Sequence, residues 1–207
     1  GAPAGDEPLN TTPTEATPPC TVTGPSVQVA SGRYLNLQNP DPNVFSVYDI
    51  AHALSHLCRY TGHVAEFYSV AQHCVLCARH ARPENRWAAL MHDAAEAYVG
   101  DVSRPLKNLL PEYRVIEKRI EAALFAHYGI VESDAVKALD RRALATERRD
   151  LMPAGEESWG VLEGVWPWAE RIIPWAPAEA KAAFLREAQI AASLECSPNG
   201  RGVGGGR

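Results

Sequence analysis

Long hydrophobic runs are missing from this sequence: no stretch approaches the roughly 18 consecutive apolar residues of a membrane-spanning helix. The first residues, GAPAGDEP, also lack the basic start and apolar block of a secretory signal peptide. A basic surplus is missing as well, because 25 acidic residues outnumber 20 Lys and Arg and leave a net charge of −5. Nucleic acid backbones are bound through such a surplus. We therefore expect a cytoplasmic protein that binds neither a membrane nor a nucleic acid polymer.

Cysteine is scarce, and its 5 copies form no disulfide framework. Cys20 and Cys196 lie in the expected tails, while Cys74 and Cys77 form a single Cys-x-x-Cys pair without the second pair that would complete a zinc site of that type. Cysteines at helical spacing are more often small buried hydrophobic residues, which is the interpretation we favour. Half of a zinc site or a redox pair is the alternative. A reducing compartment fits this usage best.

The composition divides the chain into three parts. Residues 1–30 are rich in Pro and Thr and poor in large apolar residues, which predicts a disordered extension. One domain follows over residues 31–195, and a flexible Gly-rich tail over 196–207. Residues 32–42 look like a short extended segment. Helical patterns then cover six ranges: 48–59, 65–81, 84–98, 112–128, 133–150 and 178–195. The predicted fold class is all-α, a bundle of about six helices around one core.

Four tryptophans gather in a Pro-rich stretch, at Trp159, Trp166, Trp168 and Trp175. We favour a hydrophobic cover that closes the core. A subunit interface of a homo-oligomer is the sharper alternative, since aromatic residues concentrate at interfaces. A cofactor-binding box is the least favoured of the three.

A polar pair interrupts the apolar pattern of residues 84–98. The neighbours of His92 and Asp93 three and four positions along the helix are mainly alanine and leucine, so both side chains project toward the core. Burial of a carboxylate costs free energy unless a cation compensates it. A divalent metal ion would do so, and His with Asp is a suitable ligand pair. A core histidine hydrogen-bonded to the aspartate is the structural alternative.

Two other helical patterns also direct ionisable residues inward. His73 lies at the edge of an apolar stripe, three residues after Val70. Asp140 lies four residues after Val136 and four before Leu144, on the apolar stripe of its own helix. One such conflict with the pattern would mean little, but three that converge indicate a site.

These residues resemble those of a known family. The order His73, His92-Asp93 and Asp140 resembles the HD-domain metal-dependent phosphohydrolases, an all-α family. The string HDAAEAYVGDVSRPLK is most similar to the branch that contains bacterial 5′-deoxynucleotidases and phage dATP triphosphohydrolases. DIAHALSHLCRYTGH and FYSVAQH, upstream of it, also resemble the phage-type members. The resemblance covers roughly residues 32–150.

The resemblance implies a role for each matching residue. Four of them match the ligands of one divalent metal ion (Mn, Co, Mg, Zn or Ni): His73, His92, Asp93 and Asp140. Glu96 and Asp101 match the catalytic acids that handle the nucleophilic water and the leaving group. In a branch that bridges two metals, extra histidines follow the HD pair, whereas none follows here before His127. We therefore expect one metal per site.

Five residues are expected to bind substrate. Arg59 and Lys107 match phosphate-binding positions of the family, and Arg104 adds a third cation on the loop after Asp101. Tyr60 and His63 are candidates for contacts with the base or sugar.

The expected function is hydrolysis of a deoxynucleoside triphosphate, most simply dATP, by attack at the α-phosphate with release of triphosphate. A deoxynucleoside 5′-monophosphatase that uses the same metal site is the enzymatic alternative. The alternative from another class is a non-catalytic nucleotide-binding protein. Glu96 and Asp101 argue against that last alternative, because binding alone needs no acid that handles water.

Overall fold

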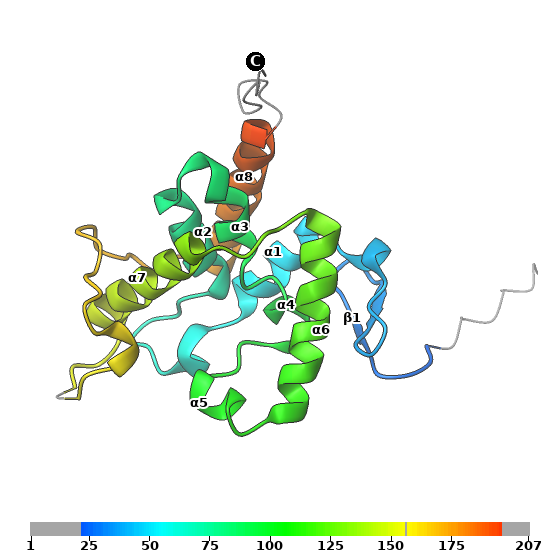
Figure 1. Ribbon diagram of the computed structural model, residues 1–207, viewed down its shortest axis with the longest axis horizontal. Helices are drawn as coiled ribbons and strands as arrows, with labels where there is room; N and C mark the ends of the chain where they lie inside the picture. The colour runs from blue at the N-terminus through cyan, green and yellow to red at the C-terminus, as the bar shows by residue number, and fades with distance from the viewer. Residues whose placement is uncertain (1–21, 156, 196–207) are drawn as a thin grey trace, which may run out of the picture.

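The computed structural model describes residues 22–155 and 157–195, and helices dominate this part of the chain (Figure 1). The mostly helical class is therefore confirmed. A small hairpin precedes the helices, in which strand β1 (Ser26–Gln28) pairs antiparallel with β2 (Tyr34–Asn36). The prediction that the unstructured extension reaches residue 30 is thus wrong for β1. Residues 1–21 and the tail at 196–207, with Cys20 and Cys196, lie outside the described residues.

Eight α-helices lie in the described ranges: α1 (Val47–His56), α2 (Val70–His80), α3 (Arg86–Met91), α4 (Glu96–Val99), α5 (Arg104–Lys107), α6 (Pro111–Tyr128), α7 (Asp134–Leu151) and α8 (Pro177–Glu195). The long predicted helices are found within a few residues of their expected ends. Three of them begin at serine caps. The hydroxyls of Ser46, Ser69 and Ser133 each accept a hydrogen bond from the backbone N–H three residues later in the chain. The expected start of the second helix at residue 65 is wrong, since α2 begins after Ser69.

The predicted helix over residues 84–98 is interrupted at the His-Asp pair. Residues 92–95 form turns between α3 and α4, and the N–H groups of Ala94 and Glu96 bond three residues back, to Met91 and Asp93. This tighter winding rotates the side chains relative to a straight α-helix. Such short departures inside a helix are frequent at functional sites, and this one carries His92 and Asp93.

The core lies where α1, α2, α3 and α8 meet (Figure 1). Helix α2 is central to this arrangement, because it contacts α1, α3, α7 and α8. The α2 side chains of Val70, Ala71 and Cys74 are fully buried there, with Leu54 of α1 and Phe184 of α8. No described helix is both long and apolar enough to cross a membrane.

The tryptophan segment closes the core only in part. Trp168 is buried and its ring stacks on that of His80 with centroids 3.8 Å apart, and Trp175 packs against the main core. Gln72 of α2 ties this segment down by accepting the Trp175 N–H at 2.8 Å. Trp166, in contrast, is 80% exposed. The interpretation as a cover therefore holds for Trp168 and Trp175, and the homo-oligomer stays a prediction.

Candidate metal centre and active-site cavity

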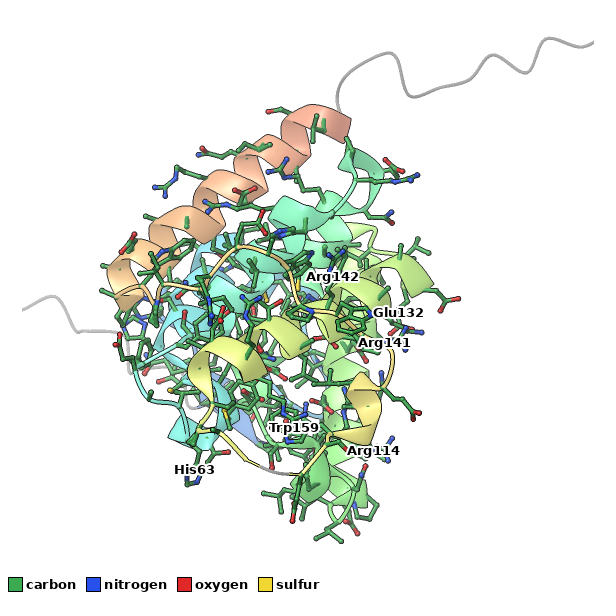
Figure 2. All side chains as sticks on the ribbon, turned by 90° about the vertical axis from the view of Figure 1, so that its left-hand side faces the viewer. His63, Arg114, Glu132, Arg141, Arg142 and Trp159 are labelled. Carbon is green, nitrogen blue, oxygen red and sulfur yellow. The ribbon has the colours of Figure 1, made fainter. Side chains whose placement is uncertain are left out.

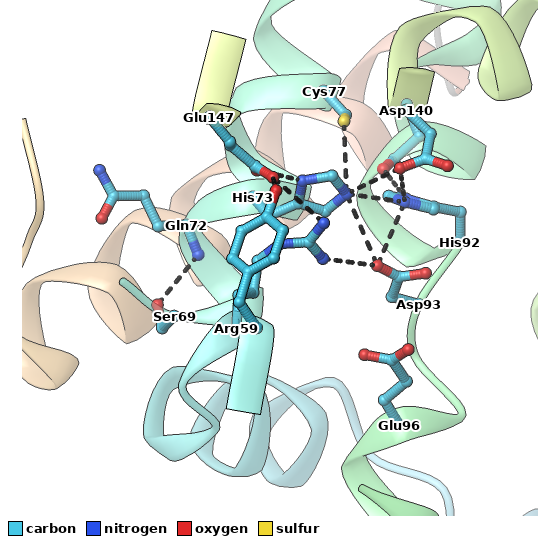
Figure 3. Close-up of polar contacts among 12 residues, drawn as sticks. Arg59, Ser69, Gln72, His73, Cys77, His92, Asp93, Glu96, Asp140 and Glu147 are labelled. Atoms are coloured by element: carbon cyan, nitrogen blue, oxygen red, sulfur yellow. Dashed lines mark hydrogen bonds and ion pairs between the residues drawn. The ribbon is translucent and has the colours of Figure 1, made fainter. Parts of the chain in front are cut away.

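Four side chains from three segments of the chain converge beside α2 (Figure 3). His73 comes from the first turn of α2, His92 and Asp93 from the turn between α3 and α4, and Asp140 from the middle of α7. The His73 Nε2 atom lies 3.2 Å from His92 Nε2, 3.6 Å from Asp93 Oδ2 and 3.3 Å from Asp140 Oδ1. His92 Nε2 lies 3.3 Å from the same Asp93 oxygen and 4.0 Å from that of Asp140. The structure thus brings the four predicted ligands together.

The two imidazoles can each present an acceptor nitrogen to the centre of this cluster. His73 Nδ1 lies 2.6 Å from Glu147 Oε1, and His92 Nδ1 lies 2.8 Å from the carbonyl oxygen of Ala89. A proton on each Nδ1 satisfies these contacts and leaves both Nε2 atoms with a lone pair. With both Nε2 atoms unprotonated, two lone pairs would face each other between two carboxylates, and a cation among them would relieve the repulsion. Imidazole and carboxylate ligands suit a divalent metal ion.

Two cysteines border the cluster. Cys77 Sγ lies 3.9 Å from His73 Nε2, and Cys74 forms a second possible ligand group with His92 and Asp93. Both cysteines are fully buried, and burial raises the pKa of each thiol. This burial agrees with the favoured interpretation of small hydrophobic residues in α2.

Glu147 is a member of the site that the sequence analysis missed. It is fully buried on α7, where its carboxylate binds His73, accepts the Tyr60 hydroxyl at 2.5 Å and pairs with Arg59 Nη2 at 3.2 Å. Burial by itself raises a carboxylate pKa, but Arg59 and His73 dominate here and lower the pKa of Glu147 to about 2. The signal was present in the spacing, because Glu147 follows Asp140 by seven residues and so lies on the same face of α7.

Replacement of Glu147 by alanine is expected to destabilise the protein strongly. The change leaves the Arg59 guanidinium, whose side chain is 11% exposed, without its main partner, and losing one member of a buried pair costs about 3–5 kcal/mol. Chemical denaturation followed by circular dichroism measures this loss. The exposed Glu163→Ala is the matched control and should change the unfolding free energy by less than about 0.5 kcal/mol. Equal stabilities for the two variants would contradict the role of Glu147.

A kink in the backbone presents Arg59 and Tyr60 to the cluster. The residues after Arg59 depart from helical geometry, and Tyr60 and Thr61 have φ angles of 57° and 54°, in the left-handed region. Residues other than glycine rarely adopt this backbone region without a compensating contact. For Tyr60 that contact is the bond to Glu147, and Arg59 Nη1 reaches Asp93 Oδ2 at 3.5 Å.

Glu96 and Asp101 lie beside the cluster as further buried acids. One Glu96 oxygen pairs with Lys107 Nζ at 3.3 Å, whereas the buried Oε2 has no hydrogen-bond partner among the described residues. Burial and the charges of Asp93 and Asp101 hold the pKa of Glu96 well above its ordinary value. Burial also raises the pKa of Asp101, although Arg59 opposes this effect. Both acids are therefore proton carriers at a higher pH than exposed carboxyls.

A cavity of about 650 Å³ opens at these residues. It is lined by ionisable side chains of the predicted site: Arg59, Asp93, Glu96, Asp101, Arg104, Lys107 and Asp140. Tyr60 and Trp159 also line it, the latter unforeseen as a cavity residue. His63 does not belong to the lining, because the turn at Gly62 leaves it exposed at the surface (Figure 2).

The chain is similar in sequence to proteins of two other bacteria. No family model matches the chain. The uncharacterized protein YfdR of Escherichia coli is 43% identical over 163 residues, which cover 77% of this chain and 91% of that protein. An uncharacterized protein of Rhodobacter capsulatus is 31% identical over 179 residues, which cover 76% of this chain and 90% of the relative. The similarity thus extends over most of each protein and not over one motif alone.

Proposed function

The chain belongs to the family of the Escherichia coli protein YfdR, and we propose that it is an HD-type, metal-dependent phosphohydrolase that acts on nucleotides. The single observation that carries the proposal is the convergence of His73, His92, Asp93 and Asp140, with both Nε2 atoms within 4.0 Å of the same carboxylate oxygens. A divalent ion held there supplies charge neutralisation for phosphoryl oxygens and lowers the pKa of water.

Around this centre, the remaining residues have distinct tasks. The unpartnered Oε2 of Glu96 orients the attacking water and takes its proton, for which a raised pKa makes the carboxylate a stronger base. Asp101, which lines the same cavity and whose pKa burial also raises, is the candidate to give a proton to the leaving oxygen. Arg59, between Asp93 and Glu147, presents its positive charge to the cavity and to the phosphate. These proton-carrying acids are what distinguishes a hydrolase from a protein that only binds nucleotides.

The length of the phosphate chain divides the proposal into two candidates. The deoxynucleoside triphosphate, dATP, is the first. The second candidate is a deoxynucleoside 5′-monophosphate, and the pairing of Lys107 favours it: Lys107 Nζ lies 2.5 Å from Glu117 Oε1 and also binds Glu96. A lysine held by two glutamates is less available for outer phosphates. Arg104 also lines the cavity. Unlike Arg59 and Lys107, it forms no ion pair within residues 22–155 and 157–195.

The test is a panel of nucleotides assayed with Mn²⁺, Co²⁺, Mg²⁺ and Zn²⁺, with orthophosphate and triphosphate resolved among the products. Release of triphosphate from dATP supports the first candidate, and release of orthophosphate from dAMP supports the second. Binding without turnover across the whole panel would leave the non-catalytic alternative and overturn the proposal.

Lys107→Ala separates the two candidates further. If Lys107 leaves Glu117 to hold the outer phosphates, its loss removes charge-assisted contacts and lowers kcat/KM for dATP about ten- to a hundredfold. Hydrolysis of dAMP, which has no outer phosphates, should change much less. The matched control is Lys118→Ala, an exposed lysine on α6 whose loss should affect neither substrate. Equal losses on both substrates would mean that Lys107 acts on the reacting phosphate or on Glu96, as the monophosphate candidate requires.

A further inference from the structure

The cavity lining contains a second group of residues that differs in chemistry from the ionisable one. Tyr60, Leu144, Trp159 and Val161 contribute rings and aliphatic side chains to the same 650 Å³ space. Neither the metal centre nor the phosphate contacts require apolar surface. This group therefore suits another part of the ligand, one that is itself flat or apolar.

Two neighbouring side chains, those of Arg148 and Tyr60, contact the ring of Trp159. The guanidinium carbon of Arg148 lies 5.1 Å from the centroid of the Trp159 ring, which places a cation over one ring face. Arg148 in turn donates from Nη2 to the carbonyl oxygen of Glu157, so its own position is fixed. The ring of Tyr60 meets Trp159 at 46° with centroids 6.1 Å apart. Because Arg148 covers one face and Trp159 also lines the cavity, ring surface that Arg148 does not cover is available to a ligand.

Helix α7 links this ring to the metal centre. Asp140, Leu144 and Arg148 follow one another at intervals of four residues and so lie along one side of the helix. Asp140 belongs to the cluster, Leu144 lines the cavity and Arg148 supports Trp159. A rise of about 1.5 Å per residue separates Asp140 from Arg148 by about 12 Å along the axis. That separation matches the reach of a nucleotide from its 5′-phosphate to its base.

We propose that Trp159 is a stacking platform for the base of the nucleotide, so that the enzyme selects nucleoside phosphates over sugar phosphates. The inference rests on the proposed function, because it assumes that the phosphate lies at the metal centre. Stacking also predicts weak discrimination among bases. The Tyr60 hydroxyl, on a ring that contacts Trp159, is already bound to Glu147 and so is not free to distinguish one base from another. Every base presents a flat face, whereas purines present the larger one.

Three tryptophan variants of the full-length protein test the platform. Trp159→Ala should weaken binding of deoxyadenosine, which has a base but no phosphate, by about 5- to 150-fold in isothermal titration calorimetry. Trp159→Phe keeps a flat ring and should lie between wild type and the alanine variant. Trp166→Ala is the matched control, since Trp166 is 80% exposed and outside the lining, and it should bind as wild type does. Thermal melts establish that each variant is folded. If the Ala variant is unfolded, the affinity of the Phe variant for deoxyadenosine decides whether Trp159 stacks on the base.

A kinetic arm separates the platform from the reaction. For nucleotide substrates Trp159→Ala should raise KM by a similar factor, while turnover of 2-deoxyribose 5-phosphate, which lacks a base, stays unchanged. The proposal that Trp159 is a stacking platform would be overturned by unaltered deoxyadenosine binding. It would also be overturned if the Ala variant lost the same fraction of kcat/KM on the nucleotide and on 2-deoxyribose 5-phosphate. If no substrate is hydrolysed but deoxyadenosine binding still depends on Trp159, the proposed function fails and the base site stands.

Discussion

Asp93→Ala is expected to abolish both metal binding and hydrolysis while leaving the protein folded. The Asp93 carboxylate lies 3.3 Å from His92 Nε2 and 3.6 Å from His73 Nε2, so it contributes a negative ligand at the centre of the cluster. Without it, the two imidazoles and Asp140 remain, and the loss of one ligand from a set of four weakens affinity by orders of magnitude. Asp93 also pairs with Arg59 at 3.5 Å, but Glu147 still holds that guanidinium, so the fold should survive.

Elemental analysis after dialysis against Mn²⁺ or Co²⁺ measures the metal directly. Thermal denaturation adds a readout that does not depend on activity, because an ion that binds only the folded state raises the melting temperature in proportion to ln(1 + [L]/Kd). Wild type should gain stability when metal is added and Asp93→Ala should not. Asp134→Ala, an exposed aspartate in the first turn of α7, is the matched control and should keep both responses. A folded Asp93→Ala that retains metal and turns over substrate would show that the site is misassigned.

The predictable part of this molecule follows from short-range rules. Helix spacing places His73 and Asp140 on inward faces, and serine caps and glycine ends set the limits of the long helices, so these features can be read from sequence. The same rule would have found Glu147, seven residues after Asp140, because a second acid on an apolar stripe needs a partner.

Other features depend on contacts between distant segments. The left-handed backbone at Tyr60 is accompanied by a side-chain bond to Glu147 of α7, which is 87 residues away in sequence. The turns at residues 92–95 lie beside His73 of α2 and Asp140 of α7, which are also distant in sequence. Local propensity would not select either geometry. The cavity position of Trp159 likewise requires the fold of a segment without regular periodicity. This is why the sequence pattern identifies the candidate metal ligands more readily than the residues that line the rest of the cavity.

Glu96→Gln is expected to keep the metal and lose catalysis. Glutamine has nearly the same shape and can still accept the Lys107 N–H that lies 3.3 Å from Oε1, so neither packing nor the cluster should change. It cannot take a proton from water, however, and one positioned acid–base group contributes about 10²–10⁴-fold in rate. Metal stoichiometry and nucleotide affinity should match those of wild type while kcat falls by that factor. Glu112→Gln, an exposed acid at the start of α6, controls for the substitution itself.

The pH dependence gives the same residue a second signature. Glu96 accepts a proton only when ionised, and burial together with Asp93 and Asp101 raises its pKa. The rate of wild type should therefore fall as the pH drops through this raised pKa, at a higher pH than an exposed carboxyl with a pKa near 4.5 would produce. In Glu96→Gln that limb of the profile should disappear from whatever rate remains. A variant that retains near wild-type kcat, or one that keeps the acidic limb unchanged, would remove Glu96 from the mechanism and transfer the role of the base to Asp101.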